Sequence, residues 1–262
     1  MTLAVISDIH GNIDALEAVL ADIDARGINR IVNLGDCLSG PFDALATAER
    51  LMALDIPTVS GNHDRQLIDR PKSDMGVWET WTIDTVTDRH LDWLRSLPFT
   101  LDIDGVFLCH ATPADDEKNW LDKRGANDRI IARDLVDVEA FAAGITQAVM
   151  LCGHTHTPRV VRISGGRMIV NPGAVGCPAY LDTRAPRHFI HQTGAPDARY
   201  AILREHAGTW AADLISVPYD ATRMADMAKA KGADSWADAV TCLLYTSPSP
   251  RDRQKSRMPS SA

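Results

Sequence analysis

Two histidines separated by a single residue follow a glycine in the stretch Gly153-His154-Thr155-His156. If this stretch lies in extended backbone at the end of a strand, residues two apart point to the same side. Both imidazoles would then face one polar pocket, and the glycine would let the main chain approach closely whatever lies there. Alone, such a pair is more often part of a solvated loop than a metal site. Its meaning comes from stretches upstream that carry the remaining ligand types.

The other candidate ligands each follow a short apolar run that predicts a β-strand. The full set is Asp8, His10, Asp36, Asn62, His110, His154 and His156. Carboxylates, a carboxamide and imidazoles without thiolate suit Mn²⁺, Fe²⁺, Co²⁺, Ni²⁺ or Zn²⁺ better than Mg²⁺ or Ca²⁺. These ligands are too many for one tetrahedral ion and fit two ions about 3.5–4 Å apart that share a carboxylate. We therefore expect two divalent metal ions, with Mn²⁺ as the first candidate and Fe, Zn, Ni or Co as alternatives.

Taken singly, these residues have ordinary alternative explanations. Asp8 or Asp36 alone would be a helix cap or a turn residue, and Asn62 alone a turn residue. His110 alone would be a hydrogen-bonded core histidine. Their recurrence in order, each time after a predicted strand, favours one shared site. Burying so many polar groups without partners would be too costly for a core explanation to hold.

The elements that must position these residues alternate along the first part of the chain. Residues 3–7, 31–34 and 56–59 are predicted strands. An apolar period of 3.6 residues predicts a helix between the N-cap Asn12 and the stop Gly27, and a second helix over residues 44–54. This alternation implies parallel strands, and sites in such sheets lie beyond the carboxyl ends of the strands.

The later part of the chain favours hairpins. Residues 99–109, 160–170 and 200–217 each pair two apolar runs across a turn. Between the two parts, residues 65–97 are predicted to be helical, with tryptophans that we expect to pack between helices rather than to stack on a base: Trp78, Trp81 and Trp93. The expected fold class is α/β, a four-layer α/β/β/α sandwich of two mixed sheets with helices on both outer faces.

The composition and net charge of the chain limit the kinds of partner it can bind. The chain has 262 residues, 45% of them apolar, and a formal charge of −8, which argues against a nucleic-acid surface. No run approaches the roughly 20 apolar residues of a membrane span, and no signal peptide is evident, so we expect a cytoplasmic protein. The cysteines show no disulfide pattern, and buried packing is a better explanation for them than a thiolate ligand. Whether the protein forms a homo-oligomer stays an open question at this point.

The C-terminal stretch differs abruptly from the rest of the chain. Residues 244–262 are rich in Ser, Pro and Arg and contain little that could be buried. We expect residues 1–243 to form one domain and residues 244–262 to be a disordered tail, foreign to the natural protein. A basic nucleic-acid tail is the alternative.

In their order, these motifs resemble the calcineurin-like metallophosphoesterase superfamily. The matching blocks are Asp8-Ile9-His10, Gly35-Asp36, Gly61-Asn62-His63-Asp64, His110 and Gly153-His154-Thr155-His156. They extend over about residues 3–220 and look most similar to the bacterial and archaeal phosphodiesterase branch, which shares the turn Asn171-Pro172-Gly173.

The resemblance implies a role for each matching residue. Asp8, His10 and His156 would hold one metal ion, Asn62, His110 and His154 the other, and Asp36 would bridge them. The catalytic residues would be His63, facing the substrate, and Asp64, orienting it. Two cations would lower the pKa of a bridging water, and His63 would protonate the leaving oxygen.

One departure concerns the stretch after Gly35-Asp36. The phosphoprotein-phosphatase branch has a phosphate-binding arginine there, whereas this chain continues Cys37-Leu38-Ser39. The departure weakens a protein-phosphatase interpretation. Basic residues of the polar stretch 111–136 are possible substitutes, as a lid over the metals, but a solvated loop is an equal alternative.

The resemblance predicts a metal-dependent hydrolase of phosphoester bonds, a phosphodiesterase or phosphatase. Its substrates would be small and soluble, such as nucleotides or dinucleoside polyphosphates. A non-catalytic metal-binding interaction scaffold of the same fold is the main alternative. A nuclease is a third, disfavoured by the acidic charge.

Overall fold

Two mixed β-sheets lie face to face in the computed structural model, which describes residues 1–125, 130–182 and 189–242. The first sheet has the order β13 (Thr209–Val217), β12 (Ala198–His206), β1 (Thr2–Ile6) and β2 (Ile31–Asn33). The second has the order β3 (Thr100–Ile103), β4 (Val106–Cys109), β7 (Val149–Leu151), β9 (Met168–Asn171) and β8 (Arg159–Arg162).

Each sheet contains parallel pairs, at the β2 edge of the first sheet and in the centre of the second. β1 runs parallel to β2, with Val5 opposite Val32, and β7 runs parallel to both β4 and β9. Antiparallel hairpins complete the edges, β12 with β13, β3 with β4 and β8 with β9. The predicted hairpins are therefore confirmed, and the carboxyl ends of the parallel strands leave each sheet at one edge.

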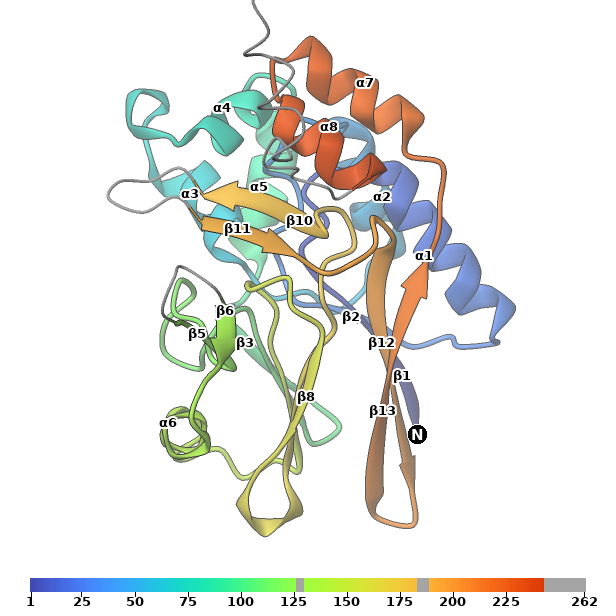
Figure 1. The fold of residues 1–262 in the computed structure, drawn as a ribbon, viewed down its shortest axis with the longest axis vertical. Coiled ribbons are helices and arrows are strands. Elements are labelled where there is room, and N and C mark those ends of the chain that lie inside the picture. The colour runs from blue at the N-terminus through green and yellow to red at the C-terminus, as the bar shows by residue number, and fades with distance from the viewer. Residues whose placement is uncertain (126–129, 183–188, 243–262) are drawn as a thin grey trace, which may run out of the picture.

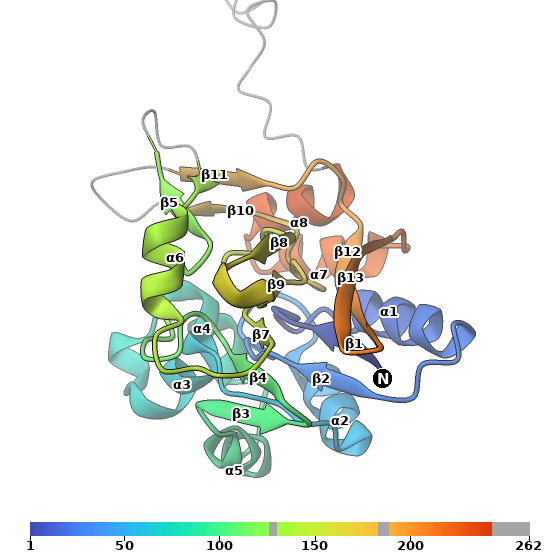
Figure 2. The same cartoon turned by 90° about the horizontal axis from the view of Figure 1, so that it is seen from below.

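The outer face of the first sheet carries α1 (Ile13–Ala25) and shares one core cluster with further helices. These are α2 (Ala44–Leu54), α3 (Asn62–Asp69), α4 (Val77–Ile83), α5 (Asp88–Ser96), α7 (Thr222–Ala230) and α8 (Asp234–Thr241). The outer face of the second sheet carries α6 (Leu135–Phe141), and Figure 2 shows α1 and α6 on opposite sides of the sheets. The predicted four-layer sandwich is confirmed, with a thin outer layer on this side.

The innermost core lies between the sheets and is built from aliphatic side chains that alternate along the strands. Leu3 and Val5 of β1 meet Leu108 of β4 and Leu151 of β7 there, all nearly inaccessible to water. Full burial of each such side chain is worth about 1.5–3 kcal/mol. This packing fixes one sheet against the other and thereby holds their carboxyl ends together.

The first helix forms as its sequence predicts. The side chain of Asn12 accepts a hydrogen bond from the N–H of Ala15, which caps the helix, and Gly27 follows its end with φ +68°. The buried face of α1 packs against the first sheet. The loop between β1 and α1 is consequently held at both ends.

The prediction of a third strand over residues 56–59 is wrong. A single parallel bridge joins Thr58 to Asn33, with Asn33 N–H bonded to Pro57 O and Val59 N–H to Asn33 O. The next bond of the ladder would need an N–H at position 57, and proline has none. The segment still leads to Asn62 beside the second strand.

Of the stretch 111–136, the structure describes residues 111–125 and 130–136, and for these the interpretation as a solvated loop is wrong. Trp120 is 1% exposed and packs with Val138 of α6 on the second sheet. The segment contains the hairpin of β5 (Asp122–Arg124) and β6 (Ile130–Ala132). A second unpredicted hairpin joins β10 (Ala179–Asp182) and β11 (Phe189–Gln192).

The predicted tail, residues 244–262, lies outside the described residues. Within the described ranges, no helix is both long and apolar enough to cross a lipid bilayer.

Candidate metal centre

The candidate ligands lie beyond the carboxyl ends of four parallel strands. Asp8 and His10 follow β1, Asp36 follows β2, and His110 follows β4. His154 and His156 follow β7, and Asn62 begins α3. The upper ends of the sheets in Figure 1 are therefore the place where these loops meet.

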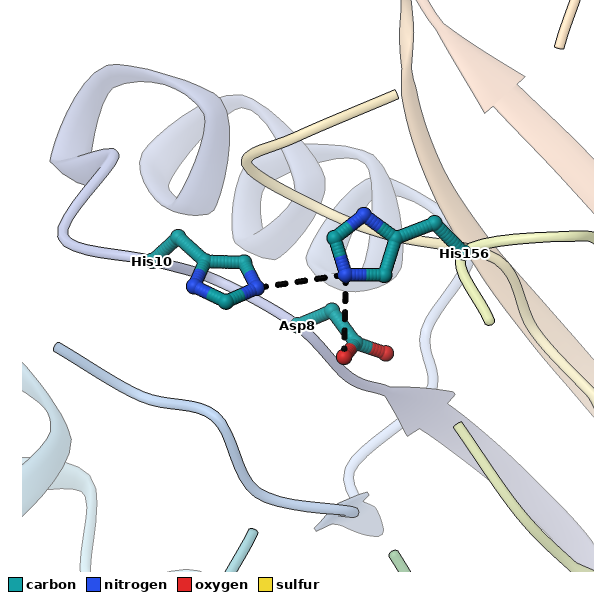
Figure 3. Close-up of side chains that lie close together, drawn as sticks. All are labelled: Asp8, His10 and His156. Carbon is teal, nitrogen blue, oxygen red and sulfur yellow. Dashed lines mark hydrogen bonds and ion pairs between the residues drawn. The ribbon is translucent and has the colours of Figure 1, made fainter. Parts of the chain in front are cut away.

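Asp8, His10 and His156 form the first group of potential ligand atoms (Figure 3). The Nε2 atom of His156 lies 3.3 Å from Asp8 Oδ1 and 3.2 Å from His10 Nε2. All three side chains are buried. Their atoms converge on a single point from two different sheets, which is the arrangement that one ion needs.

Asp36, His110 and His154 form the second group, and Asn62 adds an oxygen to it. Asn62 Oδ1 lies 3.1 Å from His110 Nε2 and 3.0 Å from His154 Nδ1. The two histidines of the Gly153–His156 stretch thus divide between the groups, as the resemblance implied.

Asp36 lies between the two groups. Its Oδ2 atom is 3.2 Å from His110 Nε2 in the second group and 3.9 Å from His10 Nε2 in the first. Its Oδ1 atom accepts a hydrogen bond of 2.9 Å from the N–H of His63. One carboxylate oxygen is therefore held by the backbone and the other faces both groups, which is the geometry expected of a bridging ligand.

Backbone carbonyls fix the orientation of three imidazoles. The Nδ1 atoms of His10, His110 and His156 lie 2.6–2.7 Å from the carbonyl oxygens of Ser39, Leu34 and Cys177 respectively. Each Nδ1 donates its hydrogen, so in the neutral ring, the form that binds a metal ion, each Nε2 presents a lone pair to the site. His154 is reversed, with Nε2 3.0 Å from Glu117 O.

These contacts leave electron pairs facing one another. When both rings are neutral, the facing Nε2 atoms of His10 and His156 are both acceptors, and Asp8 Oδ1 is a buried oxygen without a hydrogen-bond partner. Converging acceptors and an unsatisfied buried carboxylate oxygen are costly unless a cation joins them. The donor set, imidazole with carboxylate, fits a first-row divalent ion.

The pKa values of these side chains also indicate a cation site. Burial alone would raise the pKa of Asp8, but a protonated, positively charged His156 beside it lowers it to about 2. Burial would lower the pKa of His110, yet Asp36 raises it to about 9. Burial, together with His156, lowers the pKa of His10 to about 3. The carboxylates thus draw positive charge to positions where a divalent cation would supply it.

The backbone reaches this arrangement through the left-handed region. Five candidate ligands have positive φ between 52° and 67°, namely Asp8, His10, Asp36, His154 and His156. The expectation that the histidine pair lies in extended backbone is therefore wrong, because these residues form a turn after β7. Such conformations cost of order 1–3 kcal/mol each and cluster at functional sites.

The prediction that Asp64 orients His63 is wrong. The buried Asp64 carboxylate accepts hydrogen bonds from the N–H groups of Asp36, Cys37 and Gly61, at 2.8, 2.9 and 3.0 Å. It therefore joins the loop after β2 to the start of α3. Burial and the nearby charge of Asp36 raise its pKa to about 6.

Two residues of α4 contact His63 instead. Glu79 Oε1 lies 2.5 Å from His63 Nδ1, and the carboxylate is buried. The indole of Trp78 stacks on the imidazole, with centroids 4.6 Å apart and an interplanar angle of 18°. Trp78 also packs against Trp236, so the expected helix packing is only part of its contacts. Neither residue carries a motif, and only the fold brings α4 to α3.

Four of the five cysteines are buried packing residues, as expected, whereas Cys242 is exposed. Cys37, Cys109, Cys152 and Cys177 are buried and free. Burial raises the pKa of the Cys37 and Cys152 thiols. Among the described residues, the groups that could hold an ion contain no cysteine.

A family comparison agrees with this geometry. Residues 1–193 match the calcineurin-like phosphoesterase superfamily domain. The chain belongs to this superfamily.

Two relatives of the phosphoesterase chain support the assignment. An uncharacterized protein of Methanocaldococcus jannaschii is 29% identical over 241 residues, 83% of this chain and 88% of the relative. The crystal structure of a metallophosphoesterase from Sphaerobacter thermophilus is 26% identical, with a TM-score of 0.68. That match covers 93% of this chain and all of the other.

A cavity of about 250 Å³ opens beside the two ligand groups of the phosphoesterase. Its lining includes Asp36, Asn62, His63, His154 and His156. Around them lie Trp78 and Tyr180, and then Gln66, Glu117, Asn119, Arg124 and Ile130. Most of these outer residues come from outside the sequence motifs.

The shared position of Asp36 leads to a prediction about metal binding. Asp36→Asn should weaken both ions, because its Oδ2 faces both groups and loses its charge. Asp8→Asn is the matched control and should weaken only the ion of its own group. Elemental analysis after equilibration with Mn²⁺ should give two ions per chain in the wild type and close to one in Asp8→Asn. Equal losses in the two variants would contradict a bridging Asp36.

Proposed function

We propose that this protein is a metal-dependent hydrolase of small phosphoesters, a phosphodiesterase or phosphatase acting on compounds such as nucleotides or dinucleoside polyphosphates. The observation that carries the proposal is the pair of ligand groups sharing Asp36 at the cavity wall, with His63 beside them. Two bound divalent cations supply charge that neutralises phosphoryl oxygens and activates water as the nucleophile.

The chain itself contributes orientation and proton transfer. Asp8, His10, Asp36, Asn62, His110, His154 and His156 are the proposed metal ligands. His63 Nδ1 is engaged by Glu79, so Nε2 is the ring atom left to face the cavity. In the proposed mechanism, His63 Nε2 gives a proton to the leaving oxygen. Glu79 takes the orienting role first predicted for Asp64.

Finer points stay predictions. Mn²⁺ is the ion we propose for both groups, and the cytoplasm the compartment. A homo-oligomer also stays a prediction. The scaffold alternative keeps the same metal ligands but has no use for the buried Glu79 carboxylate beside His63.

A hydrolysis screen tests the proposal directly. Metal-depleted protein reconstituted with Mn²⁺ should hydrolyse p-nitrophenyl phosphate, bis-p-nitrophenyl phosphate or a diadenosine polyphosphate, and chelation should abolish the activity. The double variant Asp8→Asn/Asp36→Asn is the matched control for contaminating phosphatase. A wild type that binds two ions yet hydrolyses nothing, with any first-row divalent ion, would favour the scaffold.

The role of His63 gives the next prediction. His63→Ala should keep both ions, because its ring belongs to neither ligand group. Turnover should fall by about 10²–10⁴-fold, the usual worth of positioned proton transfer. The loss should be greatest for an alkoxide leaving group and smallest for p-nitrophenolate, which needs little protonation. If elemental analysis shows a lost ion, His63 is a ligand and the assignment fails.

Glu79 and Asp64 can be separated by matched amide substitutions. Glu79→Gln should lower turnover with the same dependence on the leaving group as His63→Ala, but more mildly, because the ring loses its charged partner. Asp64→Asn should mainly lower the melting temperature, since its carboxylate joins backbone N–H groups of two loops. If Asp64→Asn alone shows the leaving-group effect, Glu79 is not the orienting residue.

A further inference from the structure

We propose that Arg124 binds a phosphate oxygen of the substrate and favours phosphoesters that carry a second negative phosphate charge. This inference rests on the proposed function and names the substrate feature that the same cavity selects.

The hairpin of β5 and β6 brings Arg124 to the cavity. Asp122, two residues earlier on β5, is fully buried, with Oδ2 accepting a hydrogen bond from Thr155 Oγ1 at 3.1 Å. Its Oδ1 pairs with Arg159 at 2.6 Å. Residues two apart on a strand share a face, so Arg124 points the same way as Asp122. Lys123 faces away and pairs with Asp134.

Asp122 therefore joins the hairpin to the metal centre. Thr155 lies between the two candidate ligands of its turn, and its hydroxyl also accepts a hydrogen bond of 3.1 Å from Asn171. The Asn171 amide donates a second bond to Gly153 O at 2.7 Å. The turn that places His154 and the strand that places Arg124 are thus held by one buried network. This holds the β5 strand, from which Arg124 extends, against the turn that carries His154.

The charged side chains that line the cavity indicate that Arg124 is the residue that would bind an anion there. Among the described residues that line the cavity, it is the side chain with a permanent positive charge. Asp36 and Glu117 line the same space with negative charge.

A guanidinium is suited to phosphate, because its parallel N–H groups match two oxygens at once. A phosphomonoester near neutral pH carries about one more negative charge than a diester, as the second pKa of a phosphate is about 6. Glu117 lines the same cavity with negative charge, and Arg124 would offset its repulsion of that additional charge. We therefore assign to Arg124 the preference for doubly charged phosphate groups.

The test compares substrates with the same leaving group. Arg124→Ala should raise the KM for p-nitrophenyl phosphate about tenfold, the worth of one charge-assisted hydrogen bond, and leave bis-p-nitrophenyl phosphate nearly unchanged. Arg124→Lys should lie between wild type and Arg124→Ala. Lys123→Ala, on the opposite face of the same strand, is the matched control and should match the wild type.

A second readout does not require turnover. Calorimetric titration of the Mn²⁺-loaded protein with inorganic phosphate should show about tenfold weaker binding in Arg124→Ala than in Lys123→Ala. Elemental analysis should show two ions in every variant. If Arg124→Ala has a lowered melting temperature, Arg124→Gln is measured in its place.

The second negative charge can belong to the reacting phosphoryl group or to a second phosphate of the substrate. If Arg124 contacts the reacting phosphoryl group, Arg124→Ala raises the KM for p-nitrophenyl phosphate. If it contacts a second phosphate, Arg124→Ala raises the KM only for a nucleoside diphosphate. Either result supports the assignment. Equal KM changes for mono- and diester, no change for any substrate, or the same change in Lys123→Ala overturns it. A wild type without hydrolytic activity instead contradicts the proposed function, and phosphate binding then tests Arg124 alone.

Discussion

The burial of two carboxylates is the constraint on which the site depends. Asp8 and Asp36 are almost completely shielded from water, and a buried charge without partners is strongly destabilising. The chain satisfies one oxygen of each from close by, Asp8 Oδ2 by the Ser7 hydroxyl and the His154 N–H, and Asp36 Oδ1 by the His63 N–H. The other oxygen of each faces imidazoles. This balance requires loops from both sheets at one edge, so the face-to-face packing of the sheets is a condition of the site.

Backbone conformation carries part of the cost of that arrangement. Ligands held in the left-handed region are strained, and they stay there because their neighbours determine their positions more than once. Gly153 shows how tightly: a Cβ at this position would overlap the Ser7 hydroxyl and come within 2.7 Å of Asp8 Oδ2. The glycine at the start of the histidine pair is thus required by the close approach of the loop after β7 to the loop after β1. Strain and close packing together fix the ligand atoms before any ion binds, which reduces the reorganisation that binding requires.

Most of the fold and the ligand positions could be predicted because they depend on local patterns. Alternation of strand and helix gave the sheets, and polar residues at strand ends gave the ligand groups. The errors have tertiary causes. Asp64 neighbours His63 in sequence, but at the start of α3 the two side chains point in different directions, one to the backbone of the loop after β2 and one to α4. Glu79 lies 16 residues further on, and a glutamate in a helical segment is ordinarily a solvated residue. Trp120 and Asp122 lie in the polar stretch before α6, among charged residues, and no periodicity in this stretch predicted that these two side chains are buried.

The part of the chain beyond the family match also contributes to the site. The match ends at residue 193, yet Trp236 of α8 packs edge to face against Trp78, with centroids 4.6 Å apart, and lies 5.7 Å from His10. Trp78 in turn stacks on His63, so the C-terminal helix supports the imidazole through one intervening ring. Trp236 is buried and also contacts Phe42. The superfamily domain supplies the candidate ligands and also Trp78 and Glu79, which contact His63. Helix α8, beyond the match, supports this arrangement from behind, because Trp236 packs against the indole on which His63 stacks.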